Sequence, residues 1–260
     1  TVTTTDPAIN DDINVPNPAS DFVWVETIGG AEIKDYLGTR KNVHIPSQLG
    51  GKKVVRIGNQ VSYEKQLTGV IIPDTVASIG DRAFGYNRLA SISLPSHLKL
   101  IGEAAFVSNQ LTSISIPDSV TNIGSNAFSY NELVSVSIPS SLSSIESYTF
   151  ISNQLTSVSI PNSVTSIGDE AFADNQLITI TIPSSVKYIE RYAFIYNKLE
   201  SINFENNPTY INLGVFSNNN LSSISLPESL ETIGPLSFAN NKIKTLQFPN
   251  PKFQVEISHP

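Results

Sequence analysis

One spacing constrains the fold of this chain more than any other feature: leucine, phenylalanine and asparagine each recur every 22 residues. The three columns are Leu67, Leu89, Leu111, Leu133, Leu155, Leu177, Leu199, Leu221 and Ile243; Phe84, Phe106, Phe128, Phe150, Phe172, Phe194, Phe216 and Phe238; and Asn87, Asn109, Asn131, Asn153, Asn175, Asn197, Asn219 and Asn241. Proline keeps the same period from Pro73 to Pro249, and only Glu205 departs from it. Such columns predict a solenoid, in which each coil covers the apolar face of its neighbour.

The unit of residues 111–132 shows how one coil is expected to fold. Serine and isoleucine alternate over residues 113–116, which predicts a β-strand with one solvent face, and Pro117 ends it. On the return leg, meaning the part of each unit after this proline, apolar residues are spaced by three, four and one positions, which favours short helical or 3-10 turns. The sequence therefore predicts an α/β leucine-rich-repeat solenoid, wound right-handed, with one parallel sheet of about ten strands.

The asparagine and phenylalanine columns have structural interpretations. An asparagine at every turn can hydrogen-bond the backbone of its own coil and of the adjacent coil with its amide donors and carbonyl acceptor. The phenylalanine column predicts a continuous strip of core rather than a cofactor site.

Outside the repeats, composition divides the chain further. Gly29-Gly30 between apolar runs predicts a hairpin that contains the only tryptophan and covers the first coil. The predicted parts are an acidic flexible linker over 1–20, a capping hairpin over 21–42, an atypical first coil over 43–66, the solenoid over 67–249, and a tail or partial cap over 250–260.

Composition excludes several classes of function. With 16 Lys+Arg against 23 Asp+Glu the net charge is −7, which offers no basic footprint for nucleic acid. No apolar run approaches the roughly 18 residues of a membrane span. Cysteine is absent, so disulfides and thiol nucleophiles are excluded. Methionine is absent too, an initiator included, which indicates a processed or excised piece of a longer protein.

The sequence offers no catalytic constellation. His44, His97 and His259 are scattered and none has a metal-ligand partner at helical spacing. The acidic run of residues 10–14 lacks the spaced ligands of a calcium loop and is interpreted as solvated linker. We therefore expect no enzymatic activity, no cofactor and no metal.

The repeat pattern is similar to that of a known family. Units of the form L-x-x-I-x-I-P-x-x-V-x-x-I-G-x-x-A-F resemble the BspA-type (Treponema pallidum-type) leucine-rich repeats. The lead-in is also similar, through Ile33, Tyr36, Gly38, Val43, Ile45, Pro46, Gly51, Val54, Ile57 and Gly58. Family units are commonly one residue longer, with cysteine where this chain has asparagine. The resemblance covers about residues 21–249 and implies a secreted or surface-attached bacterial (or protist) protein used in adhesion or protein binding.

Two surfaces are candidates for recognition. The first, which we call the hydroxyl face, is the solvent side of the predicted strands. Its central members are Ser113, Ser115, Ser135, Ser137, Ser157, Ser159, Thr179 and Thr181. Cross-strand hydroxyl pairs that stabilise the sheet by roughly 0.2–1 kcal/mol each are the favoured interpretation. The alternative is a repeating ligand such as a glycan, another copy of the protein, or ice.

The second candidate surface lies on the return leg, where tyrosine and arginine interrupt a run of small residues. Its members are Tyr188, Arg191, Tyr192, Tyr210 and Tyr148. Exposed tyrosine beside arginine is typical of interface hot spots, although such rings can also simply cover the convex surface. Tyr86, Tyr130 and Tyr196 fall in a further column beside the asparagine turn.

These observations predict a non-enzymatic, extracellular or cell-surface module. We expect it to act as a monomer that binds a protein or extracellular-matrix ligand, or a glycan, in adhesion. A structural spacer that displays neighbouring domains, and a lectin-like module that binds a polymer along the hydroxyl face, are the alternatives. Folds of this kind carry no function by themselves.

Overall fold

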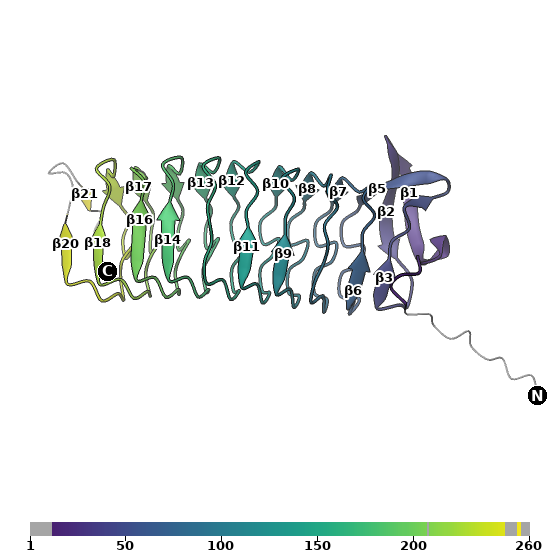
Figure 1. Ribbon diagram of the computed structural model, residues 1–260, viewed down its shortest axis with the longest axis horizontal. Helices are drawn as coiled ribbons and strands as arrows, with labels where there is room; N and C mark the ends of the chain where they lie inside the picture. Colours follow the sequence, from purple (N-terminus) through teal and green to yellow (C-terminus); the bar gives the residue numbers. More distant parts are fainter. Residues whose placement is uncertain (1–11, 207, 248–253, 256–260) are drawn as a thin grey trace, which may run out of the picture.

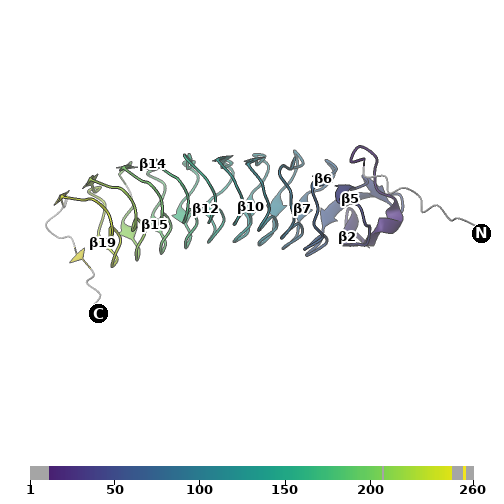
Figure 2. The ribbon, with the colours of Figure 1, turned by 90° about the horizontal axis from the view of Figure 1, so that it is seen from below.

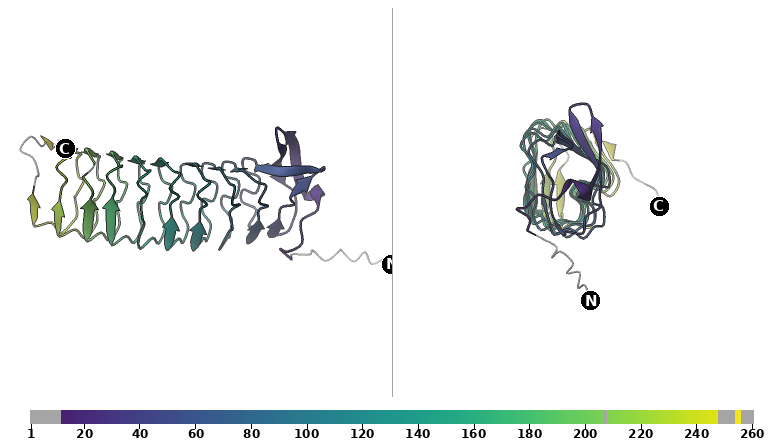
Figure 3. Two further views of the ribbon diagram at one scale, coloured as in Figure 1. Left: turned by 45° about the horizontal axis from the view of Figure 1, so that its top comes forward. Right: turned by 90° about the vertical axis from the view of Figure 1, so that its right-hand side faces the viewer.

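The computed structural model describes residues 12–206, 208–247 and 254–255. Coils of 22 residues stack along one axis into a solenoid (Figure 1) and superpose into a single closed outline when viewed from the end (Figure 3). Cα partners in neighbouring coils are 22 residues apart, as in the pairs Ser113–Ser135 and Tyr188–Tyr210, which confirms the predicted period.

Strands line two sides of the stack. On the first side lie β3 (Asn42–His44), β6 (Gly69–Ile71), β9 (Ser113–Ser115), β11 (Ser135–Ser137), β14 (Thr179–Ile182), β16 (Ser201–Phe204), β18 (Ser223–Ser225) and β20 (Thr245–Gln247). On the return leg lie β7 (Ser78–Ile79), β8 (Leu100–Ile101), β10 (Asn122–Ile123), β12 (Ser144–Ile145), β13 (Ser166–Ile167), β15 (Tyr188–Ile189), β17 (Tyr210–Ile211), β19 (Thr232–Ile233) and β21 (Gln254–Val255). Seen from below, successive coils lie side by side and roughly parallel along the long axis (Figure 2).

The N-terminal end has a different architecture. A 3-10 helix, η1 (Ala19–Asp21), precedes β1 (Phe22–Thr27) and β2 (Gly30–Tyr36), which form an antiparallel hairpin. The strand β2 then pairs in parallel with β5 (Lys52–Ile57), while the short β4 (Gln48–Leu49) pairs with β5 from the same coil. The hairpin therefore joins the return-leg ladder at the end of the stack.

Residues 12–20, predicted as part of a flexible linker, contact the first coil, whereas 1–11 lie outside the described residues. The buried Asn17 accepts a hydrogen bond from the N–H of His44 at 2.9 Å and donates to the Tyr36 hydroxyl at 3.4 Å. That hydroxyl donates to the Arg40 carbonyl, and burial, followed by the nearby charge of Asp21, raises the pKa of Tyr36 to about 12. In the predicted tail, 250–260, only 254–255 are described, where β21 pairs with β19.

The strand arrangement differs from the prediction of one sheet of about ten strands. The return-leg ladder divides into β1-β2-β5-β7-β8-β10 and β12-β13-β15-β17-β19-β21, and the first-side strands pair as β3-β6, β9-β11, β14-β16 and β18-β20. The predicted helical return turns are also wrong: within the described residues the only helix is η1, before the repeats. The α/β class is not confirmed for this β-solenoid, and its right-handed winding stays a prediction.

The spacing that suggested helical turns has another cause. Each return leg carries two residues with positive φ, such as Asn126 (61°) and Tyr130 (54°) in the unit of residues 111–132. These left-handed positions turn the backbone so that Ala127 and Phe128, although adjacent in sequence, are both buried. Backbone bonds to the next coil hold the conformation, for example from the N–H of Phe128 to the Thr149 carbonyl at 3.0 Å.

The core consists of the predicted columns. The rings of the phenylalanine column stack from coil to coil, with centroids 5.4–5.8 Å apart and ring planes within 13° of parallel. Beside them the asparagines bond the backbone as predicted: Asn131 Nδ2 donates to the Phe106 carbonyl of the preceding coil and to the Phe128 carbonyl of its own coil, and Oδ1 accepts from the N–H of Leu111.

One left-handed position offers a test of this geometry. Leu236 has φ 59° and is 60% exposed, so its side chain contributes little packing while its conformation costs about 1 kcal/mol. Because asparagine tolerates this region, Leu236→Asn is expected to raise the free energy of unfolding by about 0.5–1 kcal/mol in urea denaturation. Leu100→Asn, at an exposed leucine in the strand β8, is the control and should not stabilise. Equal effects at both leucines would contradict the argument.

Candidate functional site

The hydroxyl face lies where the sequence placed it. Ser113 and Ser115 stand on β9, Ser135 and Ser137 on β11, and Thr179 and Thr181 on β14, and all are exposed while the residues between them are buried. Ser157 and Ser159 are exposed as well, and Ser159 bridges to Ser137. The period-two alternation therefore presents eight side chains of one chemical kind on one side of the molecule.

These hydroxyl groups do not form the predicted cross-strand ladder. In the described part of the chain no hydrogen bond joins the side chains of Ser113 and Ser135, or those of Ser137 and Ser159, although the residues are paired through the backbone. The asparagine column, by contrast, uses both its donors and its acceptor. The stabilising role favoured from the sequence is therefore not supported, and the hydroxyl groups face solvent.

The hydroxyl face is not continuous. Ser157 and Ser159 are not paired with β14 in the described structure, and a hollow of about 500 Å³ lies between them. Its polar lining includes Ser157, Ser159, Thr179, Thr181, Asn162 and Glu205. Glu205 is the residue that replaces proline in the repeat, and its N–H donates to the Ile182 carbonyl at 3.0 Å, a bond that proline cannot make.

The return leg brings three of the predicted tyrosine and arginine residues into adjacent coils. Tyr188 in β15 and Tyr210 in β17 are Cα partners, so their side chains leave neighbouring strands at the same level. Tyr188 is 52% exposed and Tyr210 is half-buried. Tyr210 is held in part by a hydrogen bond from its hydroxyl to Asn212 Oδ1 at 3.4 Å.

Arg191 lies three residues after Tyr188 and has a fixed orientation. Its Nη2 donates to Asp169 Oδ2 at 3.0 Å, and its backbone N–H donates to Asp169 Oδ1 at 3.0 Å. The side-chain hydrogen bond to Asp169, followed by the charge of Asp169, raises the pKa of Arg191. We call Tyr188, Arg191 and Tyr210 the return-leg patch.

The other two predicted members, Tyr192 and Tyr148, occupy left-handed turn positions with φ 58° and 62° and are half-buried. The Tyr192 ring lies over Gly214, where a Cβ would approach Cε1 to 2.3 Å. Tyr148 belongs to a turn two coils before that of Tyr192. Tyr192 therefore covers the turn of the next coil, whereas Tyr148 interacts electrostatically with Arg191. Both remain predicted partner-binding residues.

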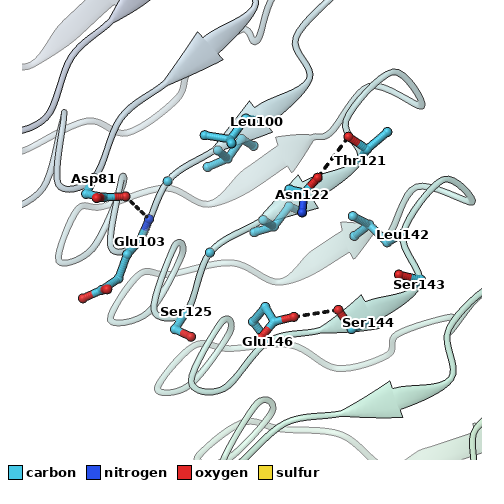
Figure 4. Close-up of a pocket in the computed structure, with 14 residues that line it drawn as sticks. Asp81, Leu100, Glu103, Thr121, Asn122, Ser125, Leu142, Ser143, Ser144 and Glu146 are labelled. Atoms are coloured by element: carbon cyan, nitrogen blue, oxygen red, sulfur yellow. Dashed lines mark hydrogen bonds between the residues drawn. The ribbon is translucent and has the colours of Figure 1, made fainter.

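A second hollow, of about 410 Å³, was not foreseen from the sequence. It lies where the return-leg ladder is interrupted between β10 and β12 (Figure 4). Leu100 and Leu142 contribute apolar side chains, and Glu103, Asn122 and Glu146 are among the polar ones. Ser144 Oγ donates to Glu146 Oε1 within one coil, and the N–H of Glu103 donates to Asp81 Oδ1 of the preceding coil.

The interruption coincides with a break in a glycine column. Gly124 and Gly168 donate through their N–H groups to isoleucine carbonyls of the preceding coil at 2.8 Å, whereas Glu190 and Asn212, in the same column, do so at 2.9 and 3.1 Å. A Cβ on Gly168 would lie 2.5 Å from the Ser147 nitrogen, so a side chain at this position requires the neighbouring backbone to shift. Glu146 makes no such bond in the described structure. Glycine is also missing at Glu190 and Asn212, where the ladder continues, so its loss alone does not predict the interruption.

The repeats of this chain match a known family of repeat proteins. The family model of the BspA type leucine rich repeat region matches six copies in the chain, over residues 55–176 and 144–257. The chain belongs to the BspA-type leucine-rich repeat family. No curated protein matches it in sequence.

Solved structures of bacterial repeat proteins share the fold of this BspA-type chain. The Treponema pallidum leucine-rich repeat protein is 26% identical, with a TM-score of 0.50 over 62% of this chain and 89% of that one. The pneumococcal vaccine antigen PcpA is 20% identical, with a TM-score of 0.56 over 92% and 71%. YopM from Yersinia enterocolitica is 18% identical, with a TM-score of 0.51 over 82% and 49%.

The described part of this BspA-type chain shows two further features relevant to function. It holds no group of three or more histidine, cysteine, aspartate or glutamate side chains that could bind a metal ion. It also contains no helix that is long and apolar enough to cross a membrane. His44 Nδ1 lies 3.1 Å from the Ile13 carbonyl, in contact with the N-terminal segment.

Proposed function

We propose that this protein is a non-enzymatic adhesion module, displayed outside the cell or on its surface, that binds a protein or extracellular-matrix component. Membership of the BspA-type family supports a protein-binding role. The structural likeness to a pneumococcal vaccine antigen supports an external location. The solenoid supports such binding because it holds side chains of successive coils in fixed register over a long surface.

The return-leg patch carries this proposal. Tyrosine and arginine are the residue types most enriched where binding energy concentrates, and here two tyrosines and an arginine lie on adjacent coils. The ion pair with Asp169 orders Arg191 before a partner arrives, which lowers the entropic cost of binding. A partner's carboxylate or peptide carbonyl next to Tyr188 can use the remaining guanidinium donors.

Removing both rings tests the proposal. Tyr188→Ala with Tyr210→Ala is expected to weaken saturable binding to the cognate matrix protein, chosen from a panel by surface plasmon resonance, about thirtyfold or more, since truncated hot spots cost about 2 kcal/mol. Val23→Ala is the control, because Val23 is 43% exposed but lies on β1, outside the patch. Both variants should keep the wild-type circular dichroism spectrum.

The panel also separates the proposed function from its alternatives. Binding that both variants retain would remove the patch from recognition. Absence of saturable binding to every matrix protein would instead favour a spacer that displays neighbouring domains.

A further inference from the structure

Every coil has a second left-handed position on the edge beside the asparagine column. This column consists of Glu64, Tyr86, Ser108, Tyr130, Ser152, Asp174, Tyr196, Asn218 and Asn240, all with φ between 51° and 56°. The left-handed region disfavours side chains with a bulky Cβ substituent and is best tolerated by asparagine and aspartate. Tyrosine therefore has no conformational reason to occur here three times.

The three tyrosines gain little packing in exchange for that conformation. Tyr86, Tyr130 and Tyr196 are 48%, 54% and 59% exposed, so about half of each residue remains in water. Tyr86 makes one aromatic contact, edge-on with Tyr63 at 5.3 Å between ring centroids. Each of these side chains requires an unfavourable backbone conformation and gains little burial in return. That combination indicates a role in binding.

The tyrosines are in register along the solenoid axis. Tyr130 lies two coils beyond Tyr86, and Tyr196 three coils beyond Tyr130, because the residue numbers differ by multiples of 22. At about 5 Å per coil the rings repeat at about 10 and 15 Å. An extended β-1,4-linked polysaccharide advances by nearly one coil spacing for each sugar, so the three rings would meet the first, third and sixth sugars of one chain.

A polar column runs beside the rings, with charged residues after the three tyrosines and amides mainly on the coils between them. Two residues after each ring position, beyond the buried asparagine, the chain carries Arg88, Gln110, Glu132, Gln154, Gln176, Lys198 and Asn220. Gln110 and Gln154 are exposed, and their amide groups make no hydrogen bond in the described structure. Such amides can pair with the equatorial hydroxyl groups of a sugar whose apolar face stacks on a neighbouring ring.

From these observations we infer that Tyr86, Tyr130 and Tyr196, which we call the tyrosine ridge, bind an extended β-1,4-linked polysaccharide lying parallel to the solenoid axis. The rings stack on the apolar faces of the sugars, and side chains of the polar column, Gln110 and Gln154 among them, hydrogen-bond their hydroxyl groups. This site is separate from the return-leg patch, so it adds a glycan ligand to the proposed protein-binding function.

The test uses hexasaccharides, which match the span of the ridge. Calorimetric titration should show saturable binding of cellohexaose or chitohexaose and none of the α-linked isomaltohexaose. Binding of chitohexaose alone would identify an N-acetylated glycan as the source, and binding of cellohexaose alone a glucan. Failure of both β-linked hexasaccharides to bind would overturn the proposal.

Substitution by serine isolates the rings without disturbing the turn, since Ser108 and Ser152 already occupy this column. Each of Tyr86→Ser, Tyr130→Ser and Tyr196→Ser should weaken binding about tenfold, and the triple variant should abolish it. The triple substitution by phenylalanine should retain affinity within about threefold, because it keeps the stacking surface. A triple serine variant that binds as the wild type does would refute the role of the ridge.

Two further variants separate this surface from the others. Tyr188→Ala with Tyr210→Ala should leave hexasaccharide binding unchanged, whatever it does to a protein ligand. Ser137→Lys with Ser159→Lys places charge on the hydroxyl face and should also leave it unchanged. Loss of binding in the lysine variant, with retention in the triple serine variant, would assign the glycan to the hydroxyl face instead.

Discussion

Asn153→Ala is expected to lower the free energy of unfolding by about 3–5 kcal/mol. Asn153 Oδ1 accepts the N–H of Leu133 at 3.0 Å, and Nδ2 donates to the carbonyls of Phe128, Phe150 and Ile151 at 3.0–3.3 Å. The site is buried, so water cannot replace these bonds, and each buried group left without a partner costs about 1–3 kcal/mol. The loss also spans a coil boundary, because Phe128 lies on the preceding coil.

Urea denaturation followed by far-ultraviolet circular dichroism measures this effect. Asn162→Ala removes an exposed amide and should change stability by less than about 0.5 kcal/mol. Asn153→Asp keeps the acceptor but replaces the donors by an oxygen facing three carbonyls, so it should destabilise as strongly as alanine. A loss below 1 kcal/mol for Asn153→Ala would show that the asparagine column does not hold the coils together.

This column was predictable from the sequence, and the reason is physical. A polar residue type that never varies at a fixed period must satisfy the same groups in each coil, and only the backbone is identical in each coil. The core was predictable for the same reason, since Leu111 and Phe128 recur with their neighbours. Because the coils are nearly identical, a residue type that recurs in all of them shows which contacts each coil makes.

The return leg was not predictable, because its conformation is imposed by stacking. Its left-handed positions hold arginine, tyrosine, glutamate and leucine, among others, and none of these prefers positive φ in isolation. Backbone bonds between coils, such as that from the N–H of Arg82 to the Glu103 carbonyl at 2.8 Å, stabilise them. A local reading of the apolar spacing therefore favoured a helix that the structure lacks.

The candidate sites divide in the same way. That Tyr188 and Tyr210 are neighbours follows directly from the period, so the return-leg patch was foreseen. The hollows near Glu205 and Glu146 depend on how far adjacent coils separate, which no single coil specifies. The first hollow coincides with the one departure from the proline column, which is a useful signal in a chain of regular repeats. The glycine column also departs at Glu190 and Asn212, where the ladder continues, so Glu146 alone did not indicate the second hollow.

In the phenylalanine stack, the stability lost on replacing a ring by alanine should depend on where in the solenoid the ring lies. Phe150→Ala is expected to cost about 3–5 kcal/mol, because it leaves a cavity between Phe128 and Phe172, whose ring centroids lie 5.8 and 5.5 Å from that of Phe150. Phe238 is only partly buried, and Phe216 is its one ring neighbour among the described residues, so Phe238→Ala should cost about half as much.

Paired urea melts of the two variants distinguish two modes of unfolding. The free energy of unfolding of a solenoid is approximately the sum of the stabilities of its coils and of the interfaces between neighbouring coils. A cavity in a central coil therefore weakens two interfaces, whereas a cavity in the last coil weakens one. Phe150→Leu, which refills most of the cavity, should recover more than half of the loss. Equal losses at Phe150 and Phe238 would mean that the stack unfolds as one unit, in which case the position of a coil would not affect how strongly its ring stabilises the chain.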